Sequence, residues 1–311
     1  MPPPCSATGR STEAVSTLHL IDASIYIFRA WHAYPDPVVD ADGEPVNAVH
    51  GFARFLLDLL ERERPSHVAV AFDESLDSSF RNTLYPAYKA NREPAPEALK
   101  RQFRQCRELA AALGLAVLSD HAYEADDLIG ALLARQRGAG FRGVIVSPDK
   151  DLSQLLADGD EQWDYARNLR WRRDQVPERL GVGAHQVADF LGLSGDPVDN
   201  IPGVPGIGAK TAIALLQHFG SLDALLARVE EVPFLRLRGA AGHAARLRQY
   251  RDQALLSRRL ATIALDAPLP ADIADARRRP SSALRERLEA VLEHLRFGPM
   301  TRRRALEQVQ G

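Results

Sequence analysis

The fold is decided by three short apolar runs that end in polar groups: LHLID (Leu18–Asp22), HVAVAFD (His67–Asp73) and GVIVS (Gly143–Ser147). The first two end in an aspartate, and the third is followed by Pro148 and then by Asp149. Leu115–Leu118 is a candidate for a fourth run. Runs of this length without polar alternation are typical of strands that are buried on both faces.

Helical patterns separate these runs. Apolar residues recur three or four positions apart in Val49–Glu61 and again in Glu124–Arg135. Continuous apolar strands that alternate with such helices predict an α/β fold, with a parallel central sheet covered by helices. Ligands of these sheets bind beyond the carboxyl ends of the strands, which is where Asp22, Asp73 and Asp149 fall.

From about Gly181 the pattern changes to short helices joined by Gly- and Pro-rich turns. We expect a mostly helical subdomain over residues 181–275 and a C-terminal helical extension over 276–311. The candidate helices are Val187–Leu193, Ala209–Phe219, Ser221–Val229, Ala244–Leu260 and Ala283–Leu295, with a weak strand signal at Ala261–Leu265. Residues 1–17 are rich in Pro, Ser and Thr, which predicts a flexible tail.

Composition excludes several classes of protein. With 45% hydrophobic residues and two cysteines in 311 residues, the chain is neither a disordered protein nor a disulfide scaffold. No apolar run approaches the roughly 18–20 residues that span a bilayer, and the N-terminus lacks the apolar stretch of a secretory signal. We therefore expect a cytoplasmic protein with no membrane segment.

The net charge of −2 taken alone argues against a nucleic-acid partner, but the charge is unevenly distributed. Residues 1–227 hold 22 basic and 31 acidic side chains, whereas residues 228–311 hold 17 basic and 10 acidic ones. Within the acidic part, Arg81–Arg104 carries six basic residues and two acidic ones. Such segments are commonly solvated faces, and they are also the form that a nucleic-acid-binding surface takes.

Nine carboxylates gather in five places along the chain. Each one alone could cap a helix or favour a helix N-terminus. Together, acids at the ends of three strands and at the start of a helix would repel one another strongly unless cations neutralise them. Oxygen ligands without a His or Cys cluster suit Mg²⁺ or Mn²⁺, and two such ions support in-line displacement at phosphorus. Phosphodiester hydrolysis is the chemistry that we predict from these acids: Asp22, Asp73, Glu124, Asp126, Asp127, Asp149, Asp151, Asp196 and Asp199.

A glycine-rich turn, GVPGIGAKT (203–211), opens a predicted helix. It is not a phosphate loop of nucleotide-triphosphate-binding proteins, because Ala209 separates Gly208 from Lys210 and no strand precedes it. A helix-hairpin-helix turn would let backbone N–H groups approach a DNA phosphate without regard to base sequence. An ordinary turn between two helices fits this segment equally well.

The long connection Leu76–Ala98 interleaves basic and aromatic residues, including Arg81, Tyr88, Lys89 and Arg92. This pattern suits a single nucleic-acid strand, with cations on phosphates and rings on bases. A long loop in a compact domain is also more often functional than not.

The ordered series LHLID, PVNAVHGFARFL, VAVAFD, SFRNTLYPAYKANR, YEADD, SPDKDLSQLL and GDPVDNIPGVPGIGAKTA resembles the 5′ nuclease (flap endonuclease) family. The likeness is closest to the N-terminal 5′→3′ exonuclease domain of bacterial DNA polymerase I and its stand-alone relatives, and it runs from about Leu18 to Phe297. It implies a PIN-like or resolvase-like nuclease core over 18–180 with a helical arch at about 76–104. It also implies that 181–275 is a helix-hairpin-helix DNA-binding subdomain. Two mild departures, Ala122 and the pair Ser147-Pro148, remove no ligand.

The resemblance also implies roles for individual residues. The nine acids match the metal site, and Asp149 is assigned a catalytic role there together with Lys89 and Arg92 of the arch, which reach the scissile phosphate. The implied cofactors are two or more Mg²⁺ ions, for which Mn²⁺ can substitute, and K⁺ at the hairpin. The DNA contacts that we expect, from the resemblance and from the connector pattern, are Phe28, Arg29, Arg81, Tyr88, Lys89, Arg92, Gly206, Gly208 and Lys210.

The function predicted is that of a structure-specific 5′→3′ exonuclease and 5′-flap endonuclease in replication or repair. We expect a monomer, associated with the bacterial nucleoid, that acts on DNA with 5′ flaps or 5′ ends and on RNA primers. A non-catalytic DNA-junction binder that retains the acids is the alternative. A phosphatase with an aspartyl nucleophile is disfavoured, because Ser24 stands where a second aspartate is required.

Overall fold

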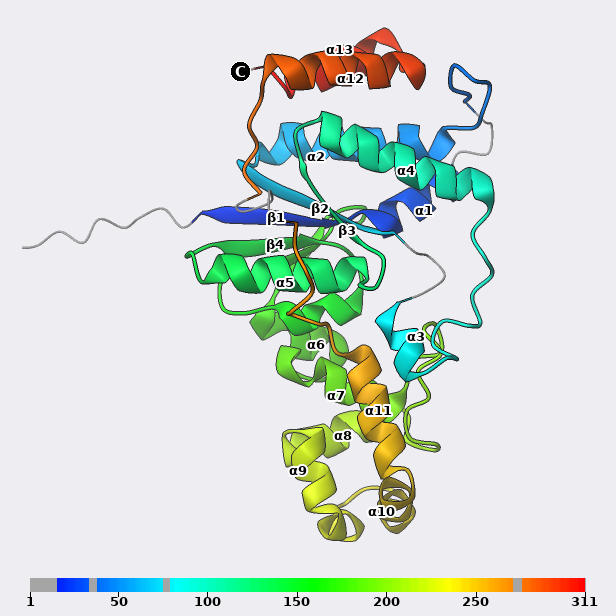
Figure 1. Cartoon of the computed structure of the whole chain (residues 1–311). Coiled ribbons are helices and arrows are strands. Elements are labelled where there is room, and N and C mark those ends of the chain that lie inside the picture. Colours follow the sequence, from blue (N-terminus) through cyan, green and yellow to red (C-terminus); the bar gives the residue numbers. More distant parts are fainter. Residues whose placement is uncertain (1–15, 34–37, 75–78, 271–275, 311) are drawn as a thin grey trace, which may run out of the picture.

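The computed structural model describes residues 16–33, 38–74, 79–270 and 276–310 (Figure 1). Most of the predicted tail, the start of the connection at 76–78 and the end of the helical subdomain at 271–275 lie outside the described residues. Among the residues described, every helix is too short or too polar to cross a membrane.

A six-stranded sheet forms the centre of the N-terminal part, in the order β3-β2-β1-β4-β5-β6. All neighbouring strands are parallel except β5 and β6, which form an antiparallel hairpin at one edge. The four predicted strands are confirmed, and the hairpin was not predicted. Its strands, EQWD and LRWR, are four residues long and each contains two charged residues, so neither shows a continuous apolar run. The strands are β1 Thr17–Asp22, β2 His67–Asp73, β3 Ala116–Asp120, β4 Arg142–Val146, β5 Glu161–Asp164 and β6 Leu169–Arg172.

Helices cover both faces of the sheet, as predicted (Figure 1). The upper face in Figure 1 carries α1 Ala23–Ala33, α2 Asn47–Glu63 and α4 Glu97–Ala112, and an outer layer of α12 Ser282–His294 and α13 Pro299–Glu307 lies over α2 and α4. The lower face carries α5 Ala125–Arg137, which packs closely on β4, because a Cβ at Gly143 would lie 2.6 Å from a methyl group of Leu133. The predicted helix Ala283–Leu295 is confirmed as α12, whereas α13 was not predicted.

The strand order places a switch point between β1 and β4. From β1 the chain moves outward through β2 and β3, and it then returns to the other side of β1 as β4. Ile21 is in register with both Val70 and Val146, so the chain segments after β1 and β4 leave the sheet side by side. A crevice of this kind at the carboxyl ends of parallel strands is where ligands of open α/β sheets bind.

Short helices make up the rest of the chain (lower part of Figure 1). The predicted helix Ala244–Leu260 is in fact two helices, which change direction at Tyr250 although no Gly or Pro marks the break. The weak strand signal at Ala261–Leu265 is wrong, because the N–H groups of Ile263 and Ala264 bond to side chains and not to a strand. The elements are α3 Phe80–Leu84, α6 Val176–Leu180, α7 Val187–Ser194, α8 Ala209–Phe219, α9 Leu222–Ala227, α10 Ala240–Gln249 and α11 Arg251–Ala261, with 3₁₀ turns η1 Lys150–Leu155, η2 Arg173–Gln175, η3 Ala184–Gln186 and η4 Val229–Phe234.

Candidate active site

Two predicted acids lie at the carboxyl ends of β1 and β2, and serines hold both of them. The hydroxyl of Ser147 donates to Asp22 at 2.9 Å, and the hydroxyl of Ser24 donates to Asp73 at 2.5 Å. The other oxygen of Asp73 accepts the N–H of Ala125 at 2.9 Å, which ties the end of β2 to the start of α5. Ser24 and Ser147 were not predicted as site residues. Their positions next to strand ends are the only sequence signal that they give.

The segment after β4 brings in the next pair of acids. Asp149 caps η1 by accepting the N–H of Asp151 at 2.9 Å. The fully buried Gln162 of β5 supports this turn from behind, since its amide donates to the carbonyls of Ser147 and Asp149 at 3.0 and 2.5 Å. The β5–β6 hairpin that the sequence did not reveal is therefore a structural support of the acidic site.

The loop after α7 contributes the last two acids. Asp196, which is 4% exposed, forms an ion pair with Lys150, whose Nζ lies 2.7 Å from a carboxylate oxygen. Asp199 faces Lys89 of the connection at 3.7 Å. Lys150 lies inside the SPDKD segment but was not predicted as a site residue.

The start of α5 separates three acids that adjoin one another in the sequence. Glu124 precedes the helix, and Asp126 lies near enough to Asp149, Asp22 and Asp73 for their charges to affect it. Asp127 points elsewhere: it is completely buried, and its two oxygens accept both terminal nitrogens of Arg81, at 2.7 and 2.8 Å.

The Arg81–Asp127 pair corrects two predictions. Arg81 is 3% exposed and also donates to the carbonyls of Leu260 and Thr262, so it is not available to a DNA strand. Asp127 also accepts the N–H groups of Glu124 and Ala264, and these bonds use the lone pairs that a metal ion would need. The pair joins the connection, α5 and the segment after α11 in the interior of the protein.

Several of the acids close to the strand ends have raised pKa values, because they are buried among other carboxylates. Burial, followed by repulsion from Asp73, raises the pKa of Asp22 to about 7. Burial and the neighbouring Asp149 raise the pKa of Asp151 to about 7 as well. Burial also raises the pKa of Asp126 well above its ordinary value, and Asp149 is the first of the carboxylates that add to this shift. Four or more carboxyl groups thus share one poorly hydrated crevice.

Cations of the connection lie over this crevice. Lys89 pairs with Glu124 at 2.9 Å, and Arg92 pairs with Asp199 at 2.5 Å. Burial alone would raise the pKa of Glu124, but Lys89 and Arg81 hold it below its ordinary value. Tyr88 donates to Glu124 and Asp199 and is only 3% exposed, so the prediction that its ring stacks on a base is wrong for this structure.

A cavity of about 580 Å³ opens beside Lys89 and Arg92. Its lining includes the predicted Phe28 together with Trp31 and His32 of the same helix, and it reaches Asp73 and Glu124. Trp31 and His32 were not predicted, although they follow Phe28 along the chain at helical spacing. Arg29 also lies on α1, but its guanidinium faces Asp164 of β5 at 3.7 Å.

The predicted helix-hairpin-helix turn, residues 203–211, leads from α7 into α8 and is called the hairpin below. Gly203 and Gly206 adopt left-handed backbone conformations, with φ of 60° and 77°, and Gly208 is the N-cap of α8. Gly203 is required sterically, because a Cβ there would lie 2.3 Å from the backbone nitrogen of Gly195. Lys210 stands in the first turn of α8 and lines a groove of about 600 Å³.

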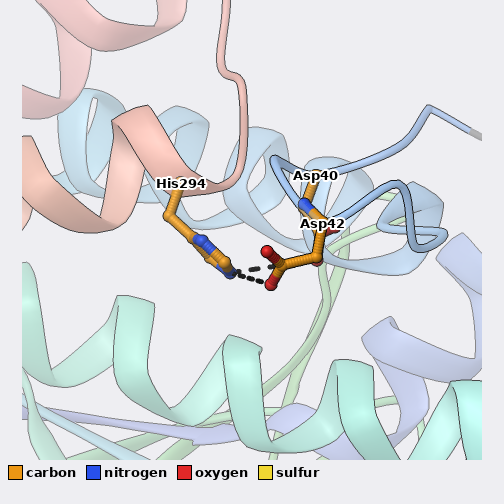
Figure 2. Close-up of side chains that lie close together, drawn as sticks. All are labelled: Asp40, Asp42 and His294. Atoms are coloured by element: carbon orange, nitrogen blue, oxygen red, sulfur yellow. Dashed lines mark hydrogen bonds and ion pairs between the residues drawn. The ribbon is translucent and has the colours of Figure 1, made fainter.

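A second acidic group lies far along the chain from these residues (Figure 2). Asp40, Asp42 and His294 are the one set of three carboxylate or imidazole ligands, among the residues described, whose ligand atoms all lie within 4.8 Å of one another. The buried Asp40 already accepts Arg101 at 2.8 Å, Gln105 at 3.1 Å and two backbone N–H groups. We therefore attribute this group to the attachment of α12 to the 38–46 turn.

The donor set at the strand ends fits divalent cations better. It consists of carboxylate oxygens without imidazole or thiolate, which suits hard cations. One oxygen of Asp151 is buried and has no hydrogen-bond partner. The like-charge repulsion described above is also the condition that a cation would relieve.

Two family models match consecutive parts of the chain. Residues 17–181 match the "5′-3′ exonuclease, N-terminal resolvase-like domain", and residues 182–283 match the "5′-3′ exonuclease, C-terminal SAM fold". The chain belongs to the 5′-3′ exonuclease family. The predictions of a 5′ nuclease and of a resolvase-like core with a helical second part are thereby confirmed.

Individual members of the family and related structures agree with this assignment. DNA polymerase I of Pseudomonas aeruginosa is 42% identical over 282 residues, which cover 90% of this chain and 30% of that protein. The chain thus spans roughly a third of the length of its curated relatives. The structure of T5 5′-exonuclease with bound zinc matches with a TM-score of 0.65 at 19% identity, covering 94% of this chain and 98% of that one. The catalytic core of Rad2 in complex with a DNA substrate matches with a TM-score of 0.60 at 14% identity, covering 96% and 93%.

Proposed function

We propose that this member of the 5′-3′ exonuclease family hydrolyses DNA phosphodiesters at 5′ flaps and 5′ ends by two-metal-ion chemistry. The observation that supports it best is the crevice at the carboxyl ends of β1, β2 and β4, where the pKa values of several buried carboxyls are raised by their neighbours. A site of this composition favours a cationic ligand over an uncharged one, because burying several carboxylates destabilises the fold unless a positive charge offsets them.

Eight of the nine predicted acids are proposed as the metal site, and Asp127 is left out because Arg81 occupies it. When bound, Mg²⁺ or Mn²⁺ would supply an activated water and neutralise charge on the leaving oxygen. The residues proposed to hold the ions directly or through water are Asp22, Asp73, Glu124, Asp126, Asp149, Asp151, Asp196 and Asp199. K⁺ at the hairpin is proposed from the family resemblance.

Lys89 and Arg92 are proposed to transfer from these acids to the scissile phosphate when DNA and metal enter. Both now pair with carboxylates that the ions would neutralise, so the transfer exchanges one anionic partner for another. The adjoining cavity, with Phe28 and Trp31 on one wall, is suited in size and lining to an unpaired nucleotide of the 5′ strand. Gly206, Gly208 and Lys210 of the hairpin are proposed to hold the duplex.

A labelled 5′-flap duplex tests this function. With Mg²⁺, the wild-type protein is expected to cleave near the flap junction, and Asp149→Asn is expected to slow cleavage by several orders of magnitude. Asparagine keeps the oxygen that caps η1, so the turn itself should survive. Asp158→Asn is the matched control, because this exposed aspartate lies on the same segment and forms its ion pair with Arg173, away from the acidic site.

The same assay separates the alternatives. Tight flap binding by the wild-type protein without any cleavage would favour the junction-binding function instead. Flaps with DNA or RNA 5′ strands, compared at equal length, test the proposed action on primers. Light scattering at several protein concentrations tests the proposed monomer, and fluorescence microscopy tests the proposed cytoplasmic, nucleoid-associated location.

A further inference from the structure

The groove beside the hairpin has a second wall, which is formed by residues outside the hairpin. It encloses about 600 Å³ and lies between the first turn of α8 and the first turn of α10. The α8 side contributes Lys210 and Thr211. The α10 side contributes Arg238, Gly239, Gly242, His243 and Arg246.

The charge of the groove is entirely positive. Its lining holds three cations, Lys210, Arg238 and Arg246, and no carboxylate. Over the part of the chain that the structure describes, none of the three forms an ion pair, whereas Arg248 on the same helix pairs with Glu230. The guanidinium of Arg246 lies against the hairpin, since a Cβ at Gly206 would come within 2.8 Å of it. Three solvent-exposed cations gathered in one concavity produce a positive potential that attracts an anion.

The N-termini of α8 and α10, one on each side of the groove, also offer backbone N–H groups to an anion. The N-caps of α8 and α10 are glycines, Gly208 and Gly239, and neither helix has a side chain that caps its first N–H groups. Uncapped N–H groups and the helix dipole favour phosphate at such ends. A further unsatisfied polar group here is His243, which lines the groove, is only 8% exposed and has a buried Nδ1 without a partner. Its Nε2 is held by the carbonyl of Arg238 at 3.1 Å.

We infer that α10 forms the second half of a clamp on the sugar-phosphate backbone of double-stranded DNA. Arg246 and Arg238 would contact phosphate oxygens beside the phosphate that the hairpin holds. This inference rests on the proposed function and deepens it, because it assigns duplex binding to residues outside the hairpin. Every group in the clamp contacts phosphate, so binding is independent of base sequence.

Binding is measured by fluorescence anisotropy with a labelled blunt duplex of about 20 base pairs in EDTA, over a series of NaCl concentrations. Arg246→Ala and Arg238→Ala are each expected to weaken binding by roughly tenfold. The slope of log K against log salt should become less steep by about 0.9 for each phosphate that the variant no longer neutralises. Arg248→Ala, whose guanidinium faces Glu230, is the matched control and is expected to change neither quantity.

Gly242 offers a variant that separates charge from folding. It is the third residue of α10, and a Cβ there would meet nothing within 4 Å. A carboxylate in the first turn favours the helix, so Gly242→Glu should keep or raise the melting temperature while it repels phosphate. Gly242→Gln adds nearly the same volume without charge, so the glutamate variant should bind the duplex at least about tenfold more weakly than the glutamine variant.

Equal duplex binding by the glutamate and glutamine variants, or unchanged affinity and salt slope for Arg246→Ala, would overturn the clamp. An equal loss of affinity for a single-stranded oligonucleotide would overturn its assignment to duplex. Flap cleavage by the wild-type protein is measured separately. If cleavage occurs but the clamp variants bind normally, only the clamp is wrong. If cleavage is absent while the variants behave as expected, only the nuclease function is wrong.

Discussion

Replacing Asp22 with asparagine should make the metal-free protein more stable at alkaline pH while it abolishes cleavage. Asp22 is 6% exposed, and burial together with Asp73 raises its pKa from 3.8 to about 7. A difference of this size between the folded and unfolded chain corresponds to about 4 kcal/mol. Because the neighbouring acids share the repulsion, we expect Asp22→Asn to gain about 2–4 kcal/mol in free energy of unfolding. The amide oxygen still accepts the hydroxyl of Ser147.

The sign of the pH dependence follows from the direction of the shift. The folded protein binds a proton at Asp22 more tightly than the unfolded chain does. The stability that this protonation contributes is complete below about pH 4, and it is lost as the pH rises from about 4 to about 7. The asparagine variant lacks this titration, so its advantage over wild type should be small at pH 4 and largest above pH 7.

Urea denaturation in EDTA at about pH 4.5 and about pH 8.5 measures both parts of this prediction. A parallel series with Mg²⁺ should stabilise wild type more at about pH 8.5 than at about pH 5.5, because the ion competes with protons for the same oxygens. The Asp22→Asn variant should gain less from Mg²⁺ at either pH. If Asp22→Asn is no more stable than wild type at the alkaline pH in EDTA, then the Asp22 charge is not confined with like charges and the reasoning fails.

Three other substitutions test separate parts of the structure. Arg81→Met leaves the buried Asp127 unpaired, and urea denaturation should show a loss of about 3–5 kcal/mol. Lys89→Met should slow single-turnover flap cleavage by at least about tenfold and leave duplex affinity unchanged in the anisotropy assay, since its ion-pair partners among the described residues, Glu124 and Asp199, lie in the crevice. Burial and then Arg170 lower the pKa of His19 to about 4, so the contribution of His19 to stability should fall by about 3 kcal/mol as the pH drops from about 6.5 to about 4. This loss opposes the gain at Asp22, so it is measured as the change over this pH range in the difference between the urea-derived free energies of unfolding of wild type and His19→Gln.

The sequence was informative where a local pattern and a tertiary environment coincide. A strand buried on both faces is apolar throughout, so the aspartate that ends it stands out, as in LHLID and HVAVAFD. The strand order then had to bring these ends together, because the carboxyl ends of parallel strands share one edge. The hairpin β5–β6 lacks such a pattern. Gln162 is buried against the turn after β4, and Trp163 is buried in the core cluster that includes α2, with the guanidinium of Arg62 5.0 Å from its ring, so their burial depends on residues outside the hairpin.

The connection shows why charge type alone does not identify a contact with DNA. Arg81, Lys89 and Arg92 lie in one basic and aromatic segment, and nothing local distinguishes them. Their tertiary positions differ: Arg81 belongs to α3 and is covered by the last turn of α11 and the residue after it, whereas the Arg92 side chain is still 46% exposed. The covering carbonyls lie 179 and 181 residues further along the chain, so no window of the sequence around Arg81 contains them.

For the two adjacent aspartates of YEADD, by contrast, the sequence does hold information that distinguishes them, because helix geometry sets the directions in which they point. Consecutive residues on a helix point about 100° apart, so helix geometry favours different surroundings for Asp126 and Asp127. Glu124 and Asp127 are three residues apart and lie on one side, where Asp127 caps the N–H of Glu124. Asp126 lies near the acids at the strand ends, whereas Asp127 is turned into the interior, where a buried cation offsets the cost of burying its charge. Arg81 is that cation, and the same pairing withdraws both residues from the chemistry of the site.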